Sequence, residues 1–250
     1  MSSCAMAAEP AIGIYGCGGR MGRTIAELLE QFDARLAGGT DVGDDPAPIA
    51  AAADVLVDFS APAALQANLA AAREAGTPVV IGTTGLTGAH HDLVDQAAAE
   101  IAVLQTGNTS LGVTLLAALV REAAARLGPE WDIEIVEMHH REKVDAPSGT
   151  ALLLGEAAAD ARGEALASDS VIGRAGLLGR RVEGTIGFAS LRGGTVAGDH
   201  QVVFAGDGER IELGHRAETR TIFARGAIRA ALWLLDKPAG RYTMAEVLGL

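Results

Sequence analysis

Residues 11–23 read AIGIYGCGGRMGR, and this stretch decides the fold. Its first five residues form an apolar run that predicts a strand, and residues 21–31 have the pattern of a helix. Between them Gly16, Gly19 and Gly22 recur every third residue, so the chain can turn sharply and approach a pyrophosphate without a Cβ in the way. The amides at the helix N-terminus would face the phosphates. The stretch predicts the first βα unit of a dinucleotide-binding domain, with a plain structural turn as the alternative.

Strand-like and helical segments alternate through the first half of the chain. Short apolar runs, each followed by small or polar residues, predict strands at 11–15, 35–40, 54–59, 78–81 and 101–105. Helical patterns lie between them, at 21–31, after Ser60 and Pro62, and at 86–100. This regular alternation predicts an α/β fold with a Rossmann-like, doubly wound parallel sheet.

The pattern changes after a helix predicted at 111–127. Alternating polar and apolar residues, a helix and three strand-like runs then follow, at 132–138, 148–161, 185–190, 201–205 and 211–213. Residues 219–236 return to a helical pattern with one apolar face. We therefore expect a dinucleotide-binding domain of residues 1–110 and 219–250, and a central α+β domain of residues 111–218.

The composition excludes two classes of function. The chain has 250 residues and a formal net charge of -12, whereas nucleic-acid binding needs a basic face. No apolar run reaches about 18 residues, so no membrane span is expected. The two cysteines, Cys4 and Cys17, form no disulfide framework or CxxC pattern, which fits a reducing compartment. We expect a cytoplasmic protein that binds small molecules.

An acidic residue closes the second predicted strand. Asp41 follows residues 35–40 directly, and a carboxylate there accepts hydrogen bonds from an adenosine ribose. The next residue is Val42 rather than an arginine, so nothing adjacent offsets the repulsion between the carboxylate and a 2′-phosphate. The sequence therefore predicts that NADH is preferred over NADPH.

Three further polar loops follow predicted strands, at 58–60 (DFS), 82–85 (GTTG) and 106–110 (TGNTS). Ligands of an open α/β sheet bind beyond the carboxyl ends of its strands. These loops could therefore orient a carboxamide such as nicotinamide. The alternative is that Ser60 and Ser110 are simple helix N-caps.

The most distinctive segment is EMHHREKVDAPSGTA at residues 137–151. It runs from the end of a predicted strand into a predicted helix, and it carries a local positive cluster of His139, His140, Arg141 and Lys143. A basic cluster beside free helix amides suits a small carboxylate or dicarboxylate, and a histidine or lysine there can move a proton near neutral pH. Adjacent residues of a strand point to opposite faces, so only one histidine would meet the ligand. A solvated basic surface is the alternative.

A metal site is not expected in this segment. Paired histidines can bind zinc, but no third ligand lies at a useful spacing.

The motifs together resemble those of the 4-hydroxy-tetrahydrodipicolinate reductase family, the dihydrodipicolinate reductases of the diaminopimelate route to lysine. The pattern E-x-H-H-x-x-K-x-D-A-P-S-G-T-A matches residues 137–151 throughout. The GxxGRMG loop, the Asp-Phe-Ser strand end, VIGTTG at 80–85 and N-x-S-x-G-V at 108–113 also match, in the same order. The resemblance covers essentially the whole chain.

The resemblance implies an oxidoreductase of lysine biosynthesis. It implies NAD(P)H-dependent reduction of 4-hydroxy-tetrahydrodipicolinate to tetrahydrodipicolinate, by a homotetramer assembled through the sheet of the central domain. His139 would be the acid/base residue and Lys143 a proton donor. The substrate carboxylates would be held by His140, Lys143, Ser148, Gly149 and Thr150. Cofactor contacts would come from Gly16, Cys17, Gly18, Gly19, Arg20, Met21, Asp41, Gly82, Thr83, Thr84, Thr106, Gly107, Asn108 and Thr109.

Two positions depart from the usual family pattern. Thr109 stands where a large or aromatic residue is frequent, and this bears on packing near the nicotinamide. Val42 stands where a basic residue is frequent, and this bears on the choice between NADH and NADPH. Two other functions remain open on the residues alone: a different small dehydrogenase with the same nucleotide domain, and a non-catalytic protein that senses dinucleotides.

Overall fold

The structure is a computed structural model that describes residues 9–250. The chain forms two compact units. The first comprises the described residues up to Ser110 together with Thr221–Leu250, and the second is Leu111–Arg220. The return to the first unit was expected at residue 219. Cys4 lies outside the described residues.

The first unit is built on a six-stranded sheet in which every strand pair is parallel. Its order is β11-β5-β4-β3-β1-β2, with bounds β1 (Ala11–Tyr15), β2 (Arg35–Thr40), β3 (Val55–Asp58), β4 (Val79–Ile81), β5 (Ala102–Gln105) and β11 (Gly240–Tyr242). The chain leaves β1 toward β2 on one side and then adds β3 on the other. Ligands of such sheets bind at this switch point, outside the carboxyl ends of the strands. The predicted Rossmann-like class is confirmed.

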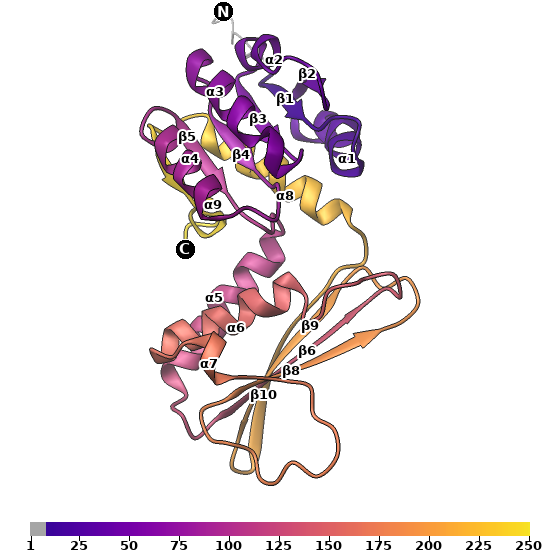
Figure 1. Ribbon diagram of the computed structural model, residues 1–250, viewed down its shortest axis with the longest axis vertical. Helices are drawn as coiled ribbons and strands as arrows, with labels where there is room; N and C mark the ends of the chain where they lie inside the picture. The colour runs from indigo at the N-terminus through magenta and orange to yellow at the C-terminus, as the bar shows by residue number, and fades with distance from the viewer. Residues whose placement is uncertain (1–8) are drawn as a thin grey trace, which may run out of the picture. The chain divides into compact units, whose positions relative to one another are not determined.

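Helices cover both faces of this sheet (Figure 1). On one face, α2 (Ala47–Ala52), α3 (Leu65–Ala75) and α4 (Gly88–Ala98) pack over Leu56, Ile81 and Val103. Since alternate strand residues point to opposite faces, Val57, Val80 and Leu104 face the other way, where α1 (Arg20–Leu28) packs beside α8 (Thr221–Leu234). The yellow α8 in Figure 1 thus returns from the end of the sequence to complete the N-terminal unit.

The second unit has a five-stranded mixed sheet with the order β10-β9-β6-β8-β7. Its strands are β6 (Asp132–His139), β7 (Ser170–Ile172), β8 (Ile186–Arg192), β9 (Asp199–Gly206) and β10 (Glu209–Arg216). The two long helices α5 (Leu111–Arg126) and α6 (Gly149–Arg162) pack on each other and on one face of this sheet, where they form an apolar core with Ile133, Ile135 and Phe188. A Cβ on Gly155 would lie 2.6 Å from Phe188 Cζ, so glycine permits the close approach of α6 to β8.

Several short elements were not predicted from the sequence. These are α2, α7 (Leu166–Asp169), β7, β11 and α9 (Met244–Val247), whereas the single-turn helices η1 (Leu29–Phe32) and η2 (Pro62–Ala64) fall at the end and at the start of predicted helices. Each has six residues or fewer, too few to establish a hydrophobic period. The helix predicted after Ser60 begins instead with η2, whose N-cap is Ala61.

Candidate functional site

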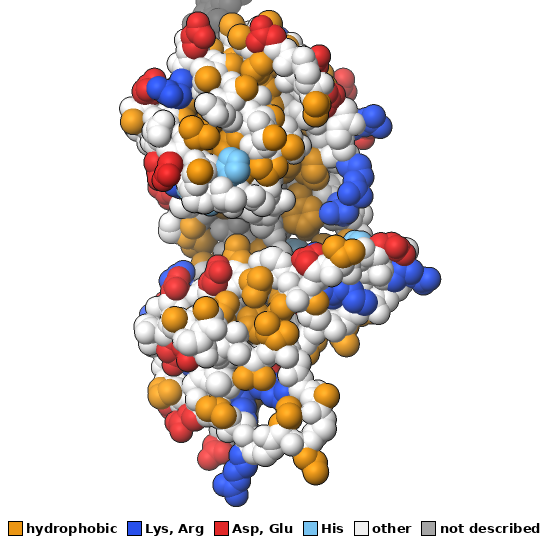
Figure 2. Space-filling view, viewed as in Figure 1, with side chains coloured by type: hydrophobic (Ala, Val, Ile, Leu, Met, Phe, Trp, Pro, Cys, Tyr) orange, Lys and Arg blue, Asp and Glu red, His pale blue; other side chains and the backbone are white. Residues whose placement is uncertain are grey.

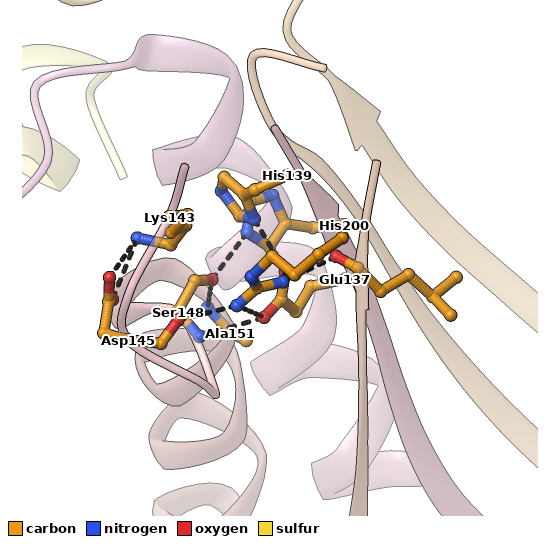
Figure 3. A network of polar contacts seen from close by, with 9 residues as sticks. Glu137, His139, Lys143, Asp145, Ser148, Ala151 and His200 are labelled. Carbon is orange, nitrogen blue, oxygen red and sulfur yellow. Dashed lines mark hydrogen bonds and ion pairs between the residues drawn. The ribbon is translucent and has the colours of Figure 1, made fainter. Parts of the chain in front are cut away.

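Segment 137–151 lies at the end of β6 and the start of α6, within the second unit. The buried face of β6 carries Ile133, Ile135, Glu137 and His139. The first two belong to the apolar core, and the last two enter the polar network of Figure 3. The alternation of a single strand therefore delivers a carboxylate and an imidazole to the N-terminus of α6.

Glu137 is the centre of this network, although it is only 1% exposed. Its Oε2 accepts hydrogen bonds from His139 Nδ1 at 2.6 Å and Arg192 Nη1 at 2.8 Å, while Oε1 accepts from Arg192 Nη2 at 2.8 Å and the Ser148 amide at 3.2 Å. Burial alone would raise the pKa of this carboxyl, but the hydrogen bonds from Arg192 and His139 outweigh it and bring the pKa to about 2. Glu137 is therefore ionised at neutral pH and can only accept hydrogen bonds.

This carboxylate assigns the tautomer of His139. Because Glu137 cannot donate, the proton of their hydrogen bond belongs to Nδ1 of the imidazole. Nε2 is then the atom that can take up or release a proton, and among residues 9–250 no group hydrogen-bonds it. The ring packs edge-on against His200, with centroids 5.1 Å apart, and a Cβ on Gly198 would lie 3.0 Å from Nε2. An oriented imidazole with one usable nitrogen is suited to general acid or base chemistry.

Lys143 lies in the loop that follows β6. Its Nζ donates to both carboxylate oxygens of Asp145 at 2.8 Å, and this bond lowers the pKa of Asp145. Arg192 Nη2 also donates to the Asp145 carbonyl oxygen at 2.6 Å. The loop that carries the lysine is thus attached to the same arginine that holds Glu137.

Ser148 is the N-cap of α6, one residue before the helix begins at Gly149, whereas the sequence predicted it as the first helical residue. Its Oγ accepts from the Ala151 amide at 3.1 Å and lies 3.0 Å from His200 Nε2. Burial and the nearby His139 lower the pKa of His200 to about 4, so this ring is neutral at pH 7. Gly149 and Thr150 form the first turn of the helix, with open space around the Gly149 Cα. The structure brings these residues together with His139 and Lys143 at one end of the second unit.

His140 follows the last residue of β6. Its amide donates to the Val196 carbonyl at 2.8 Å, and the residue is half-buried where His139 is buried. The two histidines therefore differ in environment, as expected from the alternation of a strand.

The glycine loop forms a second set of candidate residues, in the first unit. Gly16 has φ +82°, and a Cβ there would lie 2.6 Å from the Phe59 carbonyl oxygen. A Cβ on Gly22 would collide with the backbone of Gly16 and Cys17. No side chain caps α1, whose N-cap is Gly19, so the first-turn amides are available to an anion. The loop has the close backbone geometry that a pyrophosphate site requires.

Asp41 lies beside this loop at the end of β2. Its Oδ2 accepts from the Gly18 amide at 2.8 Å and from Cys17 Sγ at 3.3 Å. The adjacent Val42 is 99% exposed. The carboxylate is thus held against the glycine loop, with an open aliphatic residue next to it.

A buried carboxylate joins two of the predicted loops at the strand ends. Asp58 Oδ1 accepts from the Ser60 amide and hydroxyl at 2.9 and 2.6 Å and from Thr83 Oγ1 at 3.0 Å, and Oδ2 accepts from Asn68 Nδ2 at 2.9 Å. Ser60 is therefore not a helix cap but part of this network. Thr83 is attached to Asp58 of β3 by its bond to Oδ1, and the Gly82 amide donates to the Asp58 carbonyl at 2.9 Å.

The loop after β5 is held by its own polar groups and by α8. Thr106 Oγ1 donates to the Asn108 carbonyl at 2.9 Å, and buried Thr109 donates through Oγ1 to Phe223 O at 2.7 Å. Gly226 approaches Thr109 so closely that a Cβ would collide with its carbonyl oxygen. The small residue at position 109 thus serves the contact with α8.

Sequence reasoning missed three polar contributors. Arg192 and His200 come from strands that were predicted too short, and the role of Glu137 depends on both its burial and Arg192. The even spacing of Glu137 and His139 was the one available signal. The pairing with Arg192, 55 residues later, required the tertiary structure.

Two negative findings concern the described part of the chain. No group of three or more His, Cys, Asp or Glu residues within it could hold a metal ion. No helix of residues 9–250 is long and apolar enough to cross a membrane. On the face shown in Figure 2, blue and red side chains are mixed rather than gathered into one basic surface.

The fold and the two residue sets define a class: a two-unit protein with a Rossmann-like unit whose glycine loop suits a dinucleotide, and a separate α+β unit that carries a buried His, Glu and Arg network. Family models for the N-terminus and the C-terminus of dihydrodipicolinate reductase match residues 10–109 and 112–248. The chain belongs to the dihydrodipicolinate reductase family.

Similar proteins agree with this assignment. The chain is 59% identical to 4-hydroxy-tetrahydrodipicolinate reductase of Zymomonas mobilis over 96% of its length and 97% of that protein. It is 51% identical to the Rhodopseudomonas palustris protein of that name over 95% and 96% of the two chains. A dipicolinate-bound dihydrodipicolinate reductase from Paenisporosarcina sp. TG-14 has the same fold, with a TM-score of 0.74, 21% identity, and coverage of 94% of this chain and 97% of that one.

Proposed function

We propose that this chain reduces 4-hydroxy-tetrahydrodipicolinate to tetrahydrodipicolinate with NAD(P)H, in the diaminopimelate pathway of lysine biosynthesis, at the residue cluster of segment 137–151. The activity follows from the family. The observation that carries the assignment of the site is the Glu137–His139 hydrogen bond, which leaves Nε2 as the only proton-exchanging atom of His139. No other cluster among the described residues combines an oriented imidazole, a lysine and a helix N-terminus.

The substrate carboxylates would be held at the start of α6. Ser148, Gly149 and Thr150 present a helix N-terminus with amides and hydroxyls, and Lys143 and His140 add positive charge or donors nearby. Such a site binds anions through both its amides and the helix dipole. Lys143 would leave or share Asp145 to reach the substrate.

His139 and Lys143 supply the proton of the reduction. The hydroxyl group and a proton of the adjacent ring carbon would first leave together as water, and NAD(P)H, when bound, would supply a hydride to the carbon that bore the hydroxyl group. The adjacent ring position gains electron density during the reaction, and His139 Nε2 or Lys143 Nζ delivers a proton to it. A positioned acid of this kind contributes about 10²–10⁴-fold to the rate, and orientation by the helix terminus contributes as well.

The cofactor would lie along the carboxyl ends of the strands in the first unit. The residues of the glycine loop (16–21) suit the pyrophosphate, and Asp41 suits the adenosine ribose. The strand-end loops with Gly82, Thr83, Thr84, Thr106, Gly107, Asn108 and Thr109 suit the nicotinamide end. Because Asp41 is anionic and Val42 offers no cation, we propose that NADH is preferred over NADPH.

We also propose a cytoplasmic homotetramer built through the second unit. The proposal comes from the family resemblance, and the exposed apolar residues Ile172, Leu177, Leu178, Val182 and Leu191 of this unit could be covered in such an interface. Light scattering at several concentrations measures the mass of the assembly. A monomer at micromolar concentration would contradict the proposal.

The experiment couples the purified chain to the synthase that makes its substrate and follows cofactor absorbance. We expect turnover with both cofactors, a higher kcat/KM with NADH, and competitive inhibition by pyridine-2,6-dicarboxylate. Binding of NADH without turnover would contradict the proposed reaction. A higher kcat/KM with NADPH would contradict only the cofactor preference.

A further inference from the structure

The Glu137–Arg192 ion pair lies beneath the proposed site rather than in it. Arg192, the last residue of β8, gives both terminal nitrogens to the buried carboxylate of Glu137 at 2.8 Å. Each oxygen of Glu137 also accepts one further bond, from His139 Nδ1 on one side and from the Ser148 amide on the other. One carboxylate therefore contacts the proposed acid/base residue and the start of the proposed carboxylate clamp.

We propose that Glu137 and Arg192 are positioning residues, which together fix the proton-exchanging nitrogen of His139 and hold the clamp of α6 in register with it. The inference rests on the acid/base role proposed for His139. Neither residue needs to touch substrate or cofactor in this scheme.

The geometry explains why the pair acts as a unit. Glu137 alone could satisfy its two oxygens with neutral donors, but a buried carboxylate without a cation is costly. Arg192 supplies the opposite charge in a bidentate arrangement, which also fixes the plane of the carboxylate. A fixed plane aims Oε2 at His139 and Oε1 at Ser148. Arg192 also donates to the Asp145 carbonyl, and the Asp145 carboxylate accepts a hydrogen bond from Lys143. The ion pair is therefore connected to the lysine as well as to His139 and Ser148.

The surroundings of His139 leave Glu137 as its one anionic partner in the network. Among the charged and titratable groups of the network, Glu137 bonds the ring and His200 packs against it. Arg192 pairs with Glu137, and Lys143 pairs with Asp145 in the following loop. Of the two groups that contact the ring, only Glu137 is anionic, and it accepts the hydrogen bond from Nδ1 that orients the ring. Removal of that carboxylate should therefore release the orientation of His139.

The first experiment compares Glu137→Gln and Arg192→Lys with the intact enzyme, using kcat measured against pH. We expect Glu137→Gln to lower kcat about 10- to 100-fold and to alter the pH profile of kcat, because the carboxylate contacts the proposed acid/base residue. Arg192→Lys keeps a cation but loses the bidentate geometry, and we expect a smaller fall in kcat and weaker binding of pyridine-2,6-dicarboxylate. Titration with NADH, followed by fluorescence, gives two quantities. The number of binding sites counts the folded molecules, and the dissociation constant should change less than about twofold in both variants.

Glu134→Gln is the matched control. Glu134 lies on the same strand and also pairs with arginines, Arg174 and Arg181, but on the opposite face. We expect Glu134→Gln to lower the stability of the protein without a change in the pH profile of kcat. If Glu137→Gln also lowers only stability, with wild-type kcat and an unmoved pH profile per folded molecule, Glu137 is merely structural and the proposal is overturned.

A double variant separates this inference from the proposed function. If Glu137 acts on kcat through His139, Glu137→Gln should lower kcat less than about threefold further in a His139→Gln background, while the loss of analogue affinity persists. Equal fractional losses of kcat in both backgrounds would overturn the inference. Wild-type turnover by His139→Gln alone would instead overturn the proposed role of His139.

Discussion

Replacement of Ser148 by alanine tests whether one residue serves both the helix and the clamp. Ser148 is buried, and its Oγ accepts from the Ala151 amide while it lies 3.0 Å from His200 Nε2. Loss of a serine N-cap costs about 1 kcal/mol. The change also leaves His200 Nε2 without its partner in a buried place, which costs about 1–3 kcal/mol. The total destabilisation should be on the order of 2–4 kcal/mol.

Thermal unfolding followed by circular dichroism measures this effect. In a chain of this size 1 kcal/mol corresponds to about 2–4 °C in Tm, so we expect Ser148→Ala to lower Tm by roughly 5–10 °C. Thr243→Ala is the control, since Thr243 also caps a helix through the Glu246 amide but belongs to the first unit, and its hydroxyl bonds Glu246 rather than a histidine. It should cost about 1 kcal/mol or less.

Calorimetric titration with pyridine-2,6-dicarboxylate measures the second role of Ser148. The serine hydroxyl is expected to donate to a carboxylate, and loss of such a charge-assisted bond weakens binding about 10-fold or more. Thr243→Ala should bind the analogue as the unaltered chain does. Full analogue affinity in Ser148→Ala, with Tm lowered only as much as by Thr243→Ala, would refute the reasoning.

Three further predictions concern the first unit and the pH dependence of stability. Val42→Arg should raise kcat/KM for NADPH at least about 10-fold, because a cation beside Asp41 offsets its repulsion of a 2′-phosphate; steady-state kinetics with both cofactors checks this. Gly22→Ala should weaken NADH binding more than about 10-fold and destabilise the chain by about 1–3 kcal/mol, whereas Gly88→Ala, with open space around its Cα, should be neutral in both assays. The folded protein should lose stability as pH falls from about 6.5 to about 4, because the pKa of His200 is lowered to about 4 in the folded state and the unfolded chain takes up the proton first; denaturant unfolding of His200→Gln should show a smaller loss across that window.

The sequence predicted five of the six strands of the first unit, and four of these, β1, β3, β4 and β5, are short, mostly apolar and buried. The strands predicted at 11–15 and 35–40 match β1 and β2 residue for residue, and glycines or small polar residues end the others within one residue of their predicted limits. The glycine loop was predictable because its geometry leaves a mark in the sequence. The φ of +82° at Gly16 and the close contacts of Gly22 both exclude a side chain, so only glycine fits at these positions.

The polar network was less predictable because its members lie at the ends of strands. β8 was expected to end at residue 190 and β9 to begin at residue 201, yet they reach Arg192 and start at Asp199. Hydrophobic alternation stops where a strand leaves the core, so the residues that serve the site, Arg192 and His200, fell just outside the predicted strands. Their convergence on Glu137 and Ser148 depends on the β9-β6-β8 order of the sheet, which no local pattern in the sequence encodes.

The most direct test of the account is the kinetics of His139→Gln beside His140→Gln. If His139 is the proton-exchanging residue and His140 holds a carboxylate, His139→Gln should lower kcat about 10²–10⁴-fold with NADH affinity unchanged. His140→Gln should mainly raise KM for the substrate. A kcat for His139→Gln within about threefold of the unaltered enzyme, far short of the loss expected for a general acid, would contradict the central claim.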